Sequence, residues 1–432
     1  MARIRIISLV IFLSSFLAYS AFAELRLGQD GERINGFFEV LFGPKLGHDI
    51  TKRDDYNVLE ERLQLKTRIY PESSQLLKDW LAELNLKGDF TLDQYYSNKT
   101  GFDLREANFA VTPLNWMDLK VGRQVFTWGS GDYLFLNDLF PKDYVSFYIG
   151  RDDEYLKKPS DGIRLSLYSQ LVNFNLAVIP SFEPNTIFQG DRLSFFDPFQ
   201  GGIAGRNSER RLVEPPHQPN NTEFATRLYR NFGSYELALY TFRGFYKMPL
   251  GYLNEANREL FYPRLDAYGF SLRGPTAGGI GNIEYSFYNS RQDKSGNNRL
   301  IENSMQKFLI GYSKDLGNDL SIGTQYLYEQ ILNYSNYKQT LLTQDFRWDQ
   351  YRHLTTFRIT KLFKSQTVKV NVFSFFSPSD MDFYLRPSLD YDLNDNFKLT
   401  LGANLIWGRD DHTEFGQMEH NKNIYIRARY SF

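Results

Sequence analysis

Cysteine is absent from this 432-residue sequence, which excludes disulfide bonds, thiolate metal sites and covalent haem attachment. No run after the first residues approaches the about 18 apolar residues of a transmembrane helix. There is no phosphate-binding glycine loop and no nucleic-acid-binding signature. No Ser/His/acid set is placed to act as a catalytic triad. We therefore expect neither an enzyme nor a cofactor, and no nucleic-acid partner.

The N-terminus has the composition of an export signal. Arg3 and Arg5 precede an apolar run over residues 6–18, and Ala21-Phe22-Ala23 follows as a small-residue cleavage motif. We expect residues 1–23 to be a cleaved signal peptide and residues 24–432 to form a single domain.

The C-terminus alternates with a period of two. Ile424, Ile426, Ala428, Tyr430 and Phe432 lie on one parity, and polar residues occupy most of the other. Terminal residues usually fray, so an apolar last strand indicates a closed sheet in which it pairs with the first. The pair Tyr430 and Phe432 also resembles the assembly signal that the barrel-assembly machinery of bacteria reads.

The same alternation recurs along the chain, with links of two kinds. Short links rich in Asp, Asn, Gly and Pro read as turns at residues 112–116, 230–234, 275–279, 315–319 and 392–396. Long polar links occupy residues 43–58, 128–160, 181–222, 247–265, 332–350 and 409–420. This pattern predicts an all-β fold, a transmembrane antiparallel up-and-down β-barrel of about 18 strands.

Tryptophan placement supports a membrane location. Trp80 and Trp116 lie near the short turns, and Trp128, Trp348 and Trp407 lie near the long loops. Two aromatic girdles of this kind mark membrane interfaces. We expect a bacterial outer-membrane protein that contacts lipid and lipopolysaccharide.

Basic residues dominate the polar parity, which would face the lumen. Acidic residues on that parity are fewer, among them Glu39, Asp89, Glu106, Glu284 and Glu329. The expected pore-lining cations are Arg62, Lys66, Arg68, Lys87, Lys120, Arg123, Arg164, Arg227, Arg273, Lys307, Arg352, Arg358, Lys369, Arg386, Lys398, Arg427 and Arg429. A basic lumen favours an anionic solute. The alternative is that these charges pair across neighbouring strands and cancel.

One segment, residues 104–144, is more specific than a generic strand pattern. Its pieces are Leu104-Arg105-Glu106-Ala107, Gly122-Arg123-Gln124, Trp128-Gly129 and Pro141-Lys142-Asp143. It resembles alginate-export-type porins and related porin-like barrel families. The resemblance implies an 18-stranded pore, and it does not establish alginate as the substrate.

Arg123 conflicts with strict alternation, which places it on the lipid face beside Val121. A mid-membrane arginine on that face costs about 2–4 kcal/mol. We expect a β-bulge at Gly122, which would turn Arg123 inward and Phe126 and Trp128 outward. The alternative is that Arg123 lies high enough to reach the lipid headgroups.

The segment 128–160 mixes apolar residues with Asp132, Asp138, Asp143 and Asp152. We expect it to fold into the lumen as a constriction loop. The phenylalanine-rich 181–222 segment is a second candidate, and the alternative is that both pack as a cap outside the barrel.

A histidine and acid cluster spans residues 410–420. It could hold a divalent cation, but a solvated loop is the simpler interpretation. We expect no metal site.

These features together favour a passive channel for small anionic solutes or for oligo- or polysaccharide. The alternative is a barrel without transport, namely an adhesin, an enzyme or a sheath around a periplasmic partner.

Overall fold

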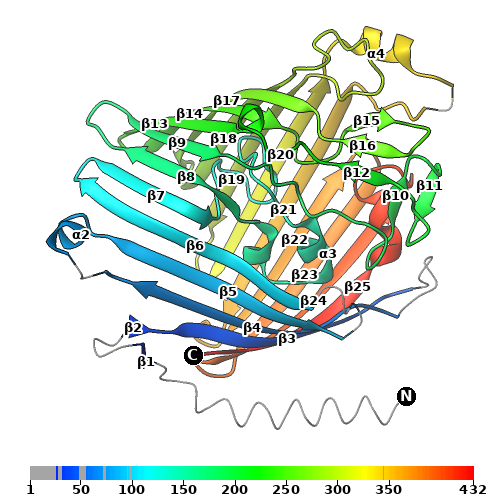
Figure 1. Cartoon of the computed structure of the whole chain (residues 1–432). Coiled ribbons are helices and arrows are strands. Elements are labelled where there is room, and N and C mark those ends of the chain that lie inside the picture. Colours follow the sequence, from blue (N-terminus) through cyan, green and yellow to red (C-terminus); the bar gives the residue numbers. More distant parts are fainter. Residues whose placement is uncertain are drawn as a thin grey trace.

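The computed structural model describes residues 26–27, 32–47, 55–71, 74–94, 96, 100–343 and 345–432. The expected signal peptide, residues 1–23, lies outside these ranges. In the described part of the chain, eighteen antiparallel strands close into one barrel (Figure 1). The expected fold class and strand number are therefore confirmed.

The strands follow one another around the wall in chain order, as in an up-and-down barrel. They are β3 (Asn35–Pro44), β4 (Tyr56–Ile69), β5 (Glu83–Asp93), β6 (Gly101–Leu114), β7 (Met117–Gln124), β8 (Ser160–Leu167), β9 (Asn173–Ile179), β13 (Glu223–Phe232), β14 (Tyr235–Phe245), β17 (Arg264–Thr276), β18 (Gly279–Ser290), β19 (Met305–Asp315), β20 (Leu320–Ile331), β21 (Tyr351–Phe363), β22 (Val368–Ser377), β23 (Asp382–Asp392), β24 (Phe397–Gly408) and β25 (Asn423–Ser431).

The last strand closes the barrel. β25 pairs with β3 from Ile426 opposite Phe42 to Ser431 opposite Phe37. Beyond the strand, Phe432 and Gly36 exchange two backbone hydrogen bonds of 3.0 Å. The expected pairing of the last strand with the first strand of the wall is confirmed, and it satisfies backbone groups that an open edge would leave unpaired.

Alternation decides which residues face outward. Ile424 and Ile426 are 41% and 48% exposed, whereas Tyr425 and Arg427, which alternate with them, are only 8% and 9% exposed. The outer surface is therefore apolar and the inner surface is packed, the reverse of a water-soluble barrel. Trp116, at a short turn, and Trp407, near a long loop, lie on this exposed apolar surface.

The links at the two rims differ. All five expected short turns join consecutive strands at one end, here called the short-turn rim. The link of residues 70–82 at this rim contains helix α2 (Gln75–Asp79), whose N-cap is Ser74. The turn at residues 364–367 was not predicted from the sequence. Its residues Lys364, Ser365 and Gln366 adopt positive φ, but the segment contains no glycine or proline that would indicate a turn. Within the described ranges, no helix has the length and apolar character needed to cross a bilayer.

The opposite end, the long-loop rim, carries additional small elements (Figure 1). A two-stranded sheet joins β10 (Phe195–Asp197) and β11 (Gly202–Ala204), and a three-stranded sheet joins β12 (Arg211–Val213), β16 (Glu259–Phe261) and β15 (Gly251–Asn254). Helix α4 (Tyr334–Thr340) and the 3-10 helices η4 (Pro219–Asn221) and η5 (Gly416–Asn421) complete this rim. A separate two-stranded pair, β1 (Arg26–Leu27) with β2 (Glu32–Arg33), precedes the barrel.

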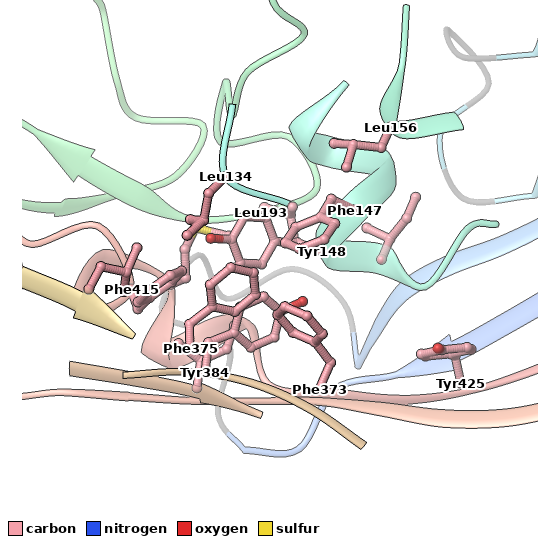
Figure 2. Close-up of a cluster of buried hydrophobic side chains, with 14 of the residues drawn as sticks. Leu134, Phe147, Tyr148, Leu156, Leu193, Phe373, Phe375, Tyr384, Phe415 and Tyr425 are labelled. Atoms are coloured by element: carbon pink, nitrogen blue, oxygen red, sulfur yellow. The ribbon is translucent and has the colours of Figure 1, made fainter. Parts of the chain in front are cut away.

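The chain between β7 and β8, residues 125–159, lies inside the barrel. It carries helix α3 (Tyr144–Ile149) and the 3-10 helix η3 (Asp153–Leu156). The main hydrophobic core joins α3 to inward-facing residues of β19–β25, and it is drawn in Figure 2. The centre of the barrel is thus filled by this internal loop.

The segment 181–222 covers the internal loop from the long-loop rim. Phe188 packs its ring against Tyr148 of α3 at a centroid distance of 5.4 Å. Arg192 donates to the backbone oxygen of Asn57 at 2.7 Å and pairs with Asp93. The two candidate loops therefore form two layers, one within the wall and one above it.

Candidate functional site

Glu284 of β18 holds the start of the internal loop. Its Oε1 accepts hydrogen bonds from Ser130 Oγ at 2.7 Å and from the Gly131 amide at 3.0 Å. Its Oε2 accepts from Asn137 Nδ2 at 3.0 Å. Opposite this contact, a Cβ on Gly269 would lie 1.9 Å from Asn137 Oδ1, so only glycine leaves room for the loop. A single buried carboxylate thereby satisfies several loop donors.

Small wall residues make room for loop aromatics on the neighbouring strands. Phe126 and Phe140 stack at 5.3 Å and pack against Ala177, Ala225 and Ala267. Trp128 lies edge-on to Phe140 at 5.0 Å. The expectation that Phe126 and Trp128 point outward is wrong, because the chain leaves the wall after Gln124, where β7 ends, and strand alternation no longer decides their direction.

Helix α3 is fixed at both ends and along its inner face. Asp143 caps its N-terminus by accepting from the Ser146 amide at 2.9 Å, and Gly150 ends it with φ of 85°. Tyr148 stacks on Tyr384 at 5.1 Å. Figure 2 shows Phe147 and Tyr148 facing the aromatic residues of β22 and β23. Asp143, expected at the constriction, therefore stabilises the loop itself.

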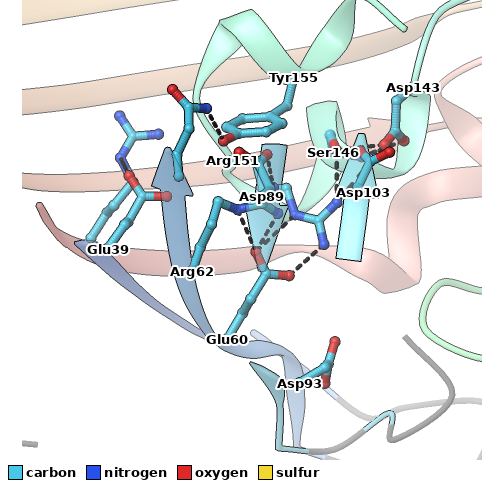
Figure 3. A network of polar contacts seen from close by, with 12 residues as sticks. Glu39, Glu60, Arg62, Asp89, Asp93, Asp103, Asp143, Ser146, Arg151 and Tyr155 are labelled. Atoms are coloured by element: carbon cyan, nitrogen blue, oxygen red, sulfur yellow. Dashed lines mark hydrogen bonds and ion pairs between the residues drawn. The ribbon is translucent and has the colours of Figure 1, made fainter. Parts of the chain in front are cut away.

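A buried ionic network ties the end of the loop to β4 and β5 (Figure 3). Glu60 accepts from Arg62 at 2.6 Å and also pairs with Arg151 of the loop. Arg62 reaches Asp89 at 2.8 Å, and its guanidinium lies 4.1 Å from the centre of the Tyr155 ring. Removing one member would leave a buried charge without compensation.

Arg105 and Lys142, both in the segment that carries the resemblance, also hold the loop. Arg105 donates to the Lys157 backbone oxygen at 2.8 Å. Lys142 is almost fully buried and reaches Asp138 Oδ1 at 2.9 Å. Burial lowers the pKa of Lys142, and Asp138 counteracts that effect. Asp138 is therefore an internal partner of the loop.

Three further loop carboxylates face arginines of the wall. Asp152 lies 3.4 Å from Arg427 and 3.3 Å from Arg429. Burial raises the pKa of Asp152, but these two arginines outweigh it and the net shift is downward. Similar pairs join Asp132 to Arg358 at 3.4 Å and Asp153 to Arg386 at 3.3 Å.

Two cavities lie on either side of Tyr133. The upper one, about 220 Å³, faces the long-loop rim and is lined by Lys307, Glu329 and Arg352 among others. The lower one, about 210 Å³, is lined by wall residues that include Lys369 and Arg386. Tyr133 lines both cavities.

Tyr133 is held tightly between them. Its ring meets Phe373 edge-on at 4.7 Å and lies 5.3 Å from Phe147. Its hydroxyl donates to Asp153. Burial raises the pKa of this hydroxyl, so it stays a neutral donor at physiological pH. Tyr133 is thus the side chain that separates the two halves of the lumen.

The two halves differ in charge. Above Tyr133, Arg352 pairs with Glu329, Asp380 and Glu414, and Lys307 pairs with Glu329 at 2.6 Å. Towards the short-turn rim, ion pairs among the described residues include Arg68 with Glu83, Lys87 with Glu154, Arg227 with Glu236 and Lys398 with Asp392. Glu106 lies opposite Lys87 in the ladder. Within the described ranges, no ion pair includes Lys66, Lys120, Arg164, Arg273 or Lys369. The carboxylates Glu106, Asp118 and Asp390 are likewise without an ion pair, so the lower half keeps a small surplus of positive charge.

Arg123 remains on the outer parity. The ladders between β6, β7 and β8 run through Gly122 without a register shift, and the irregularity in this region lies at Val111–Leu114. The expected bulge at Gly122 is therefore wrong, although Gly122 has φ of 119°. Arg123 instead donates to the Leu104 backbone oxygen at 2.6 Å and approaches Asp161 at 3.3 Å, which compensates its charge on that face.

The sequence did not indicate Tyr133, Arg151, Asp153 or Glu154 as site residues. Strand periodicity carries no information on a loop, so only their presence in a mixed apolar and charged segment was visible.

The histidine and acid cluster separates in space: His412 stacks on Phe346 at 5.0 Å, Glu414 pairs with Arg352 and Glu419 pairs with Lys422. Among the described residues, no group of three His, Asp or Glu side chains is arranged to hold a metal ion.

Comparisons with known proteins bear on the fold. No family model and no curated protein matches the sequence. Among solved structures, OccAB3 of Acinetobacter baumannii aligns with a TM-score of 0.56 and 10% identity over 93% of this chain and 99% of that chain. A mutant porin of Rhodopseudomonas blastica aligns over 93% of this chain and 100% of that chain, with a TM-score of 0.42 and 11% identity. At these identities the likeness concerns the fold alone, which is a porin-like β-barrel.

Proposed function

We propose that this protein is a passive outer-membrane channel for small anionic solutes, with the internal loop as its constriction. The apolar outer face supports the outer-membrane location, as does the export signal expected in residues 1–23. The observation that carries the proposal is the pair of cavities that meet at Tyr133 inside a closed barrel. A solute that passes Tyr133 moves from a charge-balanced upper cavity to a lower half with surplus positive charge.

The surplus arises because the loop neutralises only part of the wall. Asp132, Asp152 and Asp153 each face an arginine of the wall. Lys369 lines the lower cavity without an ion pair among the described residues, although Asp390 lies opposite it in the strand ladder and lines the same cavity. A low-dielectric wall focuses the field of such residues into the pore. The packing of Tyr133 between Phe147 and Phe373 favours small solutes over polysaccharide.

The experiment is a reversal-potential measurement across a salt gradient. Residues 24–432 are reconstituted in a planar bilayer, with Lys369→Glu as the test variant and the exposed loop variant Lys294→Glu as its charge-matched control. We expect anion preference in the native chain, a clear loss of it in Lys369→Glu and no change in Lys294→Glu. Cation preference in the native chain contradicts the selectivity, and absence of conductance contradicts the channel. The proposed contacts with lipopolysaccharide and the barrel-assembly machinery are separate predictions.

A further inference from the structure

A third cavity, of about 410 Å³, lies among the loops of the long-loop rim. It is built from five different connections, and its lining includes Tyr252 of β15 and Tyr337 of α4. Figure 1 shows both elements at this rim. It lies outside the two cavities that Tyr133 separates, and its lining shares no residue with them. The conduction path therefore gives it no role.

Aromatic rings form much of its lining. Phe196 meets Phe346 edge-on at 4.9 Å on one side, and Phe199 meets Tyr252 edge-on at 5.6 Å on another. Trp348 also lines the cavity. Phenylalanine, tyrosine and tryptophan rings from three separate loops line this space, together with the ring of His412, which stacks on Phe346 at 5.0 Å.

The polar part of the lining is mainly acidic. Glu255 is engaged by Arg299 through two hydrogen bonds of 2.9 and 2.5 Å, and Asp345 lies 3.5 Å from the same arginine. Glu302 lines the cavity as well, but it makes no hydrogen bond or ion pair with the described residues. Glu255 and Asp345 thus share Arg299, whereas Glu302 is unpaired among the described residues, which leaves the lining with a net negative charge.

Glu302 is the group that lacks compensation. Burial raises its pKa to about 7, Lys307 of the wall works in the opposite direction and Glu329 adds to the rise. Glu302 is partly buried. A partly buried carboxylate without a hydrogen-bond partner is costly, so an occupant that brings positive charge would stabilise it. A second anion would instead add repulsion.

We propose that this rim cavity binds an organic ammonium cation, with the charge beside Glu302 and the alkyl groups against the aromatic rings. Aromatic faces attract desolvated cations through their quadrupole, and quaternary ammonium ions are the typical ligands of such cages. An ammonium group also satisfies the charge of Glu302, which a neutral ligand cannot do. This inference is independent of the proposed anion path, since binding is measurable without conductance.

The test is isothermal titration calorimetry on the full barrel in detergent at pH 8. Choline is compared with 3,3-dimethyl-1-butanol, which has the same shape without the charge, and with glucose. We expect choline to bind and the neutral isostere to bind about tenfold more weakly. Equal affinity for choline and its isostere, tighter binding of glucose, or no choline binding in the millimolar range each overturns the proposal.

Variants locate the site. Glu302→Gln keeps the size of the side chain and should weaken choline binding about tenfold. Glu214→Gln removes an equal charge from an exposed loop position outside the cavity and should leave the affinity unchanged. Unchanged binding in Glu302→Gln, or an equal loss in both variants, contradicts this location. Single-channel conductance of Glu302→Gln should match that of the native chain, which shows that the barrel is intact.

Discussion

Tyr133→Ala is the substitution that should change the lumen most. The side chain lines both the upper cavity of about 220 Å³ and the lower cavity of about 210 Å³. Alanine removes the ring between Phe147 and Phe373 together with the hydroxyl that donates to Asp153. The two cavities would then form one continuous space.

The size of the effect follows from the position of the ring. Resistances along a pore add in series, so widening the narrowest point raises the total conductance. We expect single-channel conductance to rise on the order of twofold or more. Truncating a buried aromatic side chain costs about 3–5 kcal/mol when a cavity remains. The cost here should lie at the lower end, since Tyr133 already borders open space on two sides.

Planar-bilayer recordings of three proteins separate the explanations. Tyr133→Phe keeps the ring and loses only the hydroxyl, so its conductance should stay near the native value. Tyr133→Ala should differ from both. If Tyr133→Ala conducts like the native chain, the solute path does not pass this residue and the assignment of the constriction is wrong. If Tyr133→Phe conducts as much as Tyr133→Ala, the hydrogen bond to Asp153 rather than the ring controls passage.

Three other predictions test separate parts of the structure. Glu284→Gln removes the carboxylate charge that accepts the loop hydrogen bonds, and hydrogen bonds to a charged group contribute about 2 kcal/mol. We therefore expect larger fluctuations of the single-channel current in Glu284→Gln than in the control Glu236→Gln. Equal current noise in the two variants would contradict the role of Glu284 as the anchor of the loop. Choline affinity should rise between about pH 6 and pH 8, because Glu302, whose pKa is raised to about 7, loses its proton in that range. The titratable and charged groups around Glu302 are Lys307, Glu329, Arg299, Glu255, Asp345 and His412. The pH dependence of choline affinity should disappear in Glu302→Gln and persist in His412→Gln. The opposite result would show that Glu302 does not control the pH dependence. Deleting Phe432 removes two backbone hydrogen bonds to Gly36 at the closing seam, so the yield of heat-modifiable barrel on electrophoresis should fall, and native yield would show that the seam needs only β25.

Sequence periodicity was sufficient for the wall of the barrel. In a strand, successive side chains point to opposite faces, so the pattern from Ile424 to Tyr430 already indicates which residues face outward. The turn at residues 392–396 is equally local, since the side chain of Asn394 accepts hydrogen bonds from the backbone amides of Asn396 and Phe397. The turn at Lys364–Gln366 shows the limit of this approach, because its residues carry no turn signal and the strand ladder on both sides imposes the conformation.

The contents of the lumen depend on contacts between residues far apart in the chain. Phe126 and Trp128 turn inward because Ala177, Ala225 and Ala267, on three other strands, leave space for them. Asp152 and Asp153 form ion pairs with arginines of the wall and so compensate part of their positive charge. These two carboxylates reach the wall only because α3 carries the loop across the barrel. Local alternation determines the two faces of the sheet, whereas tertiary packing decides which of the inward charges remain available to a solute.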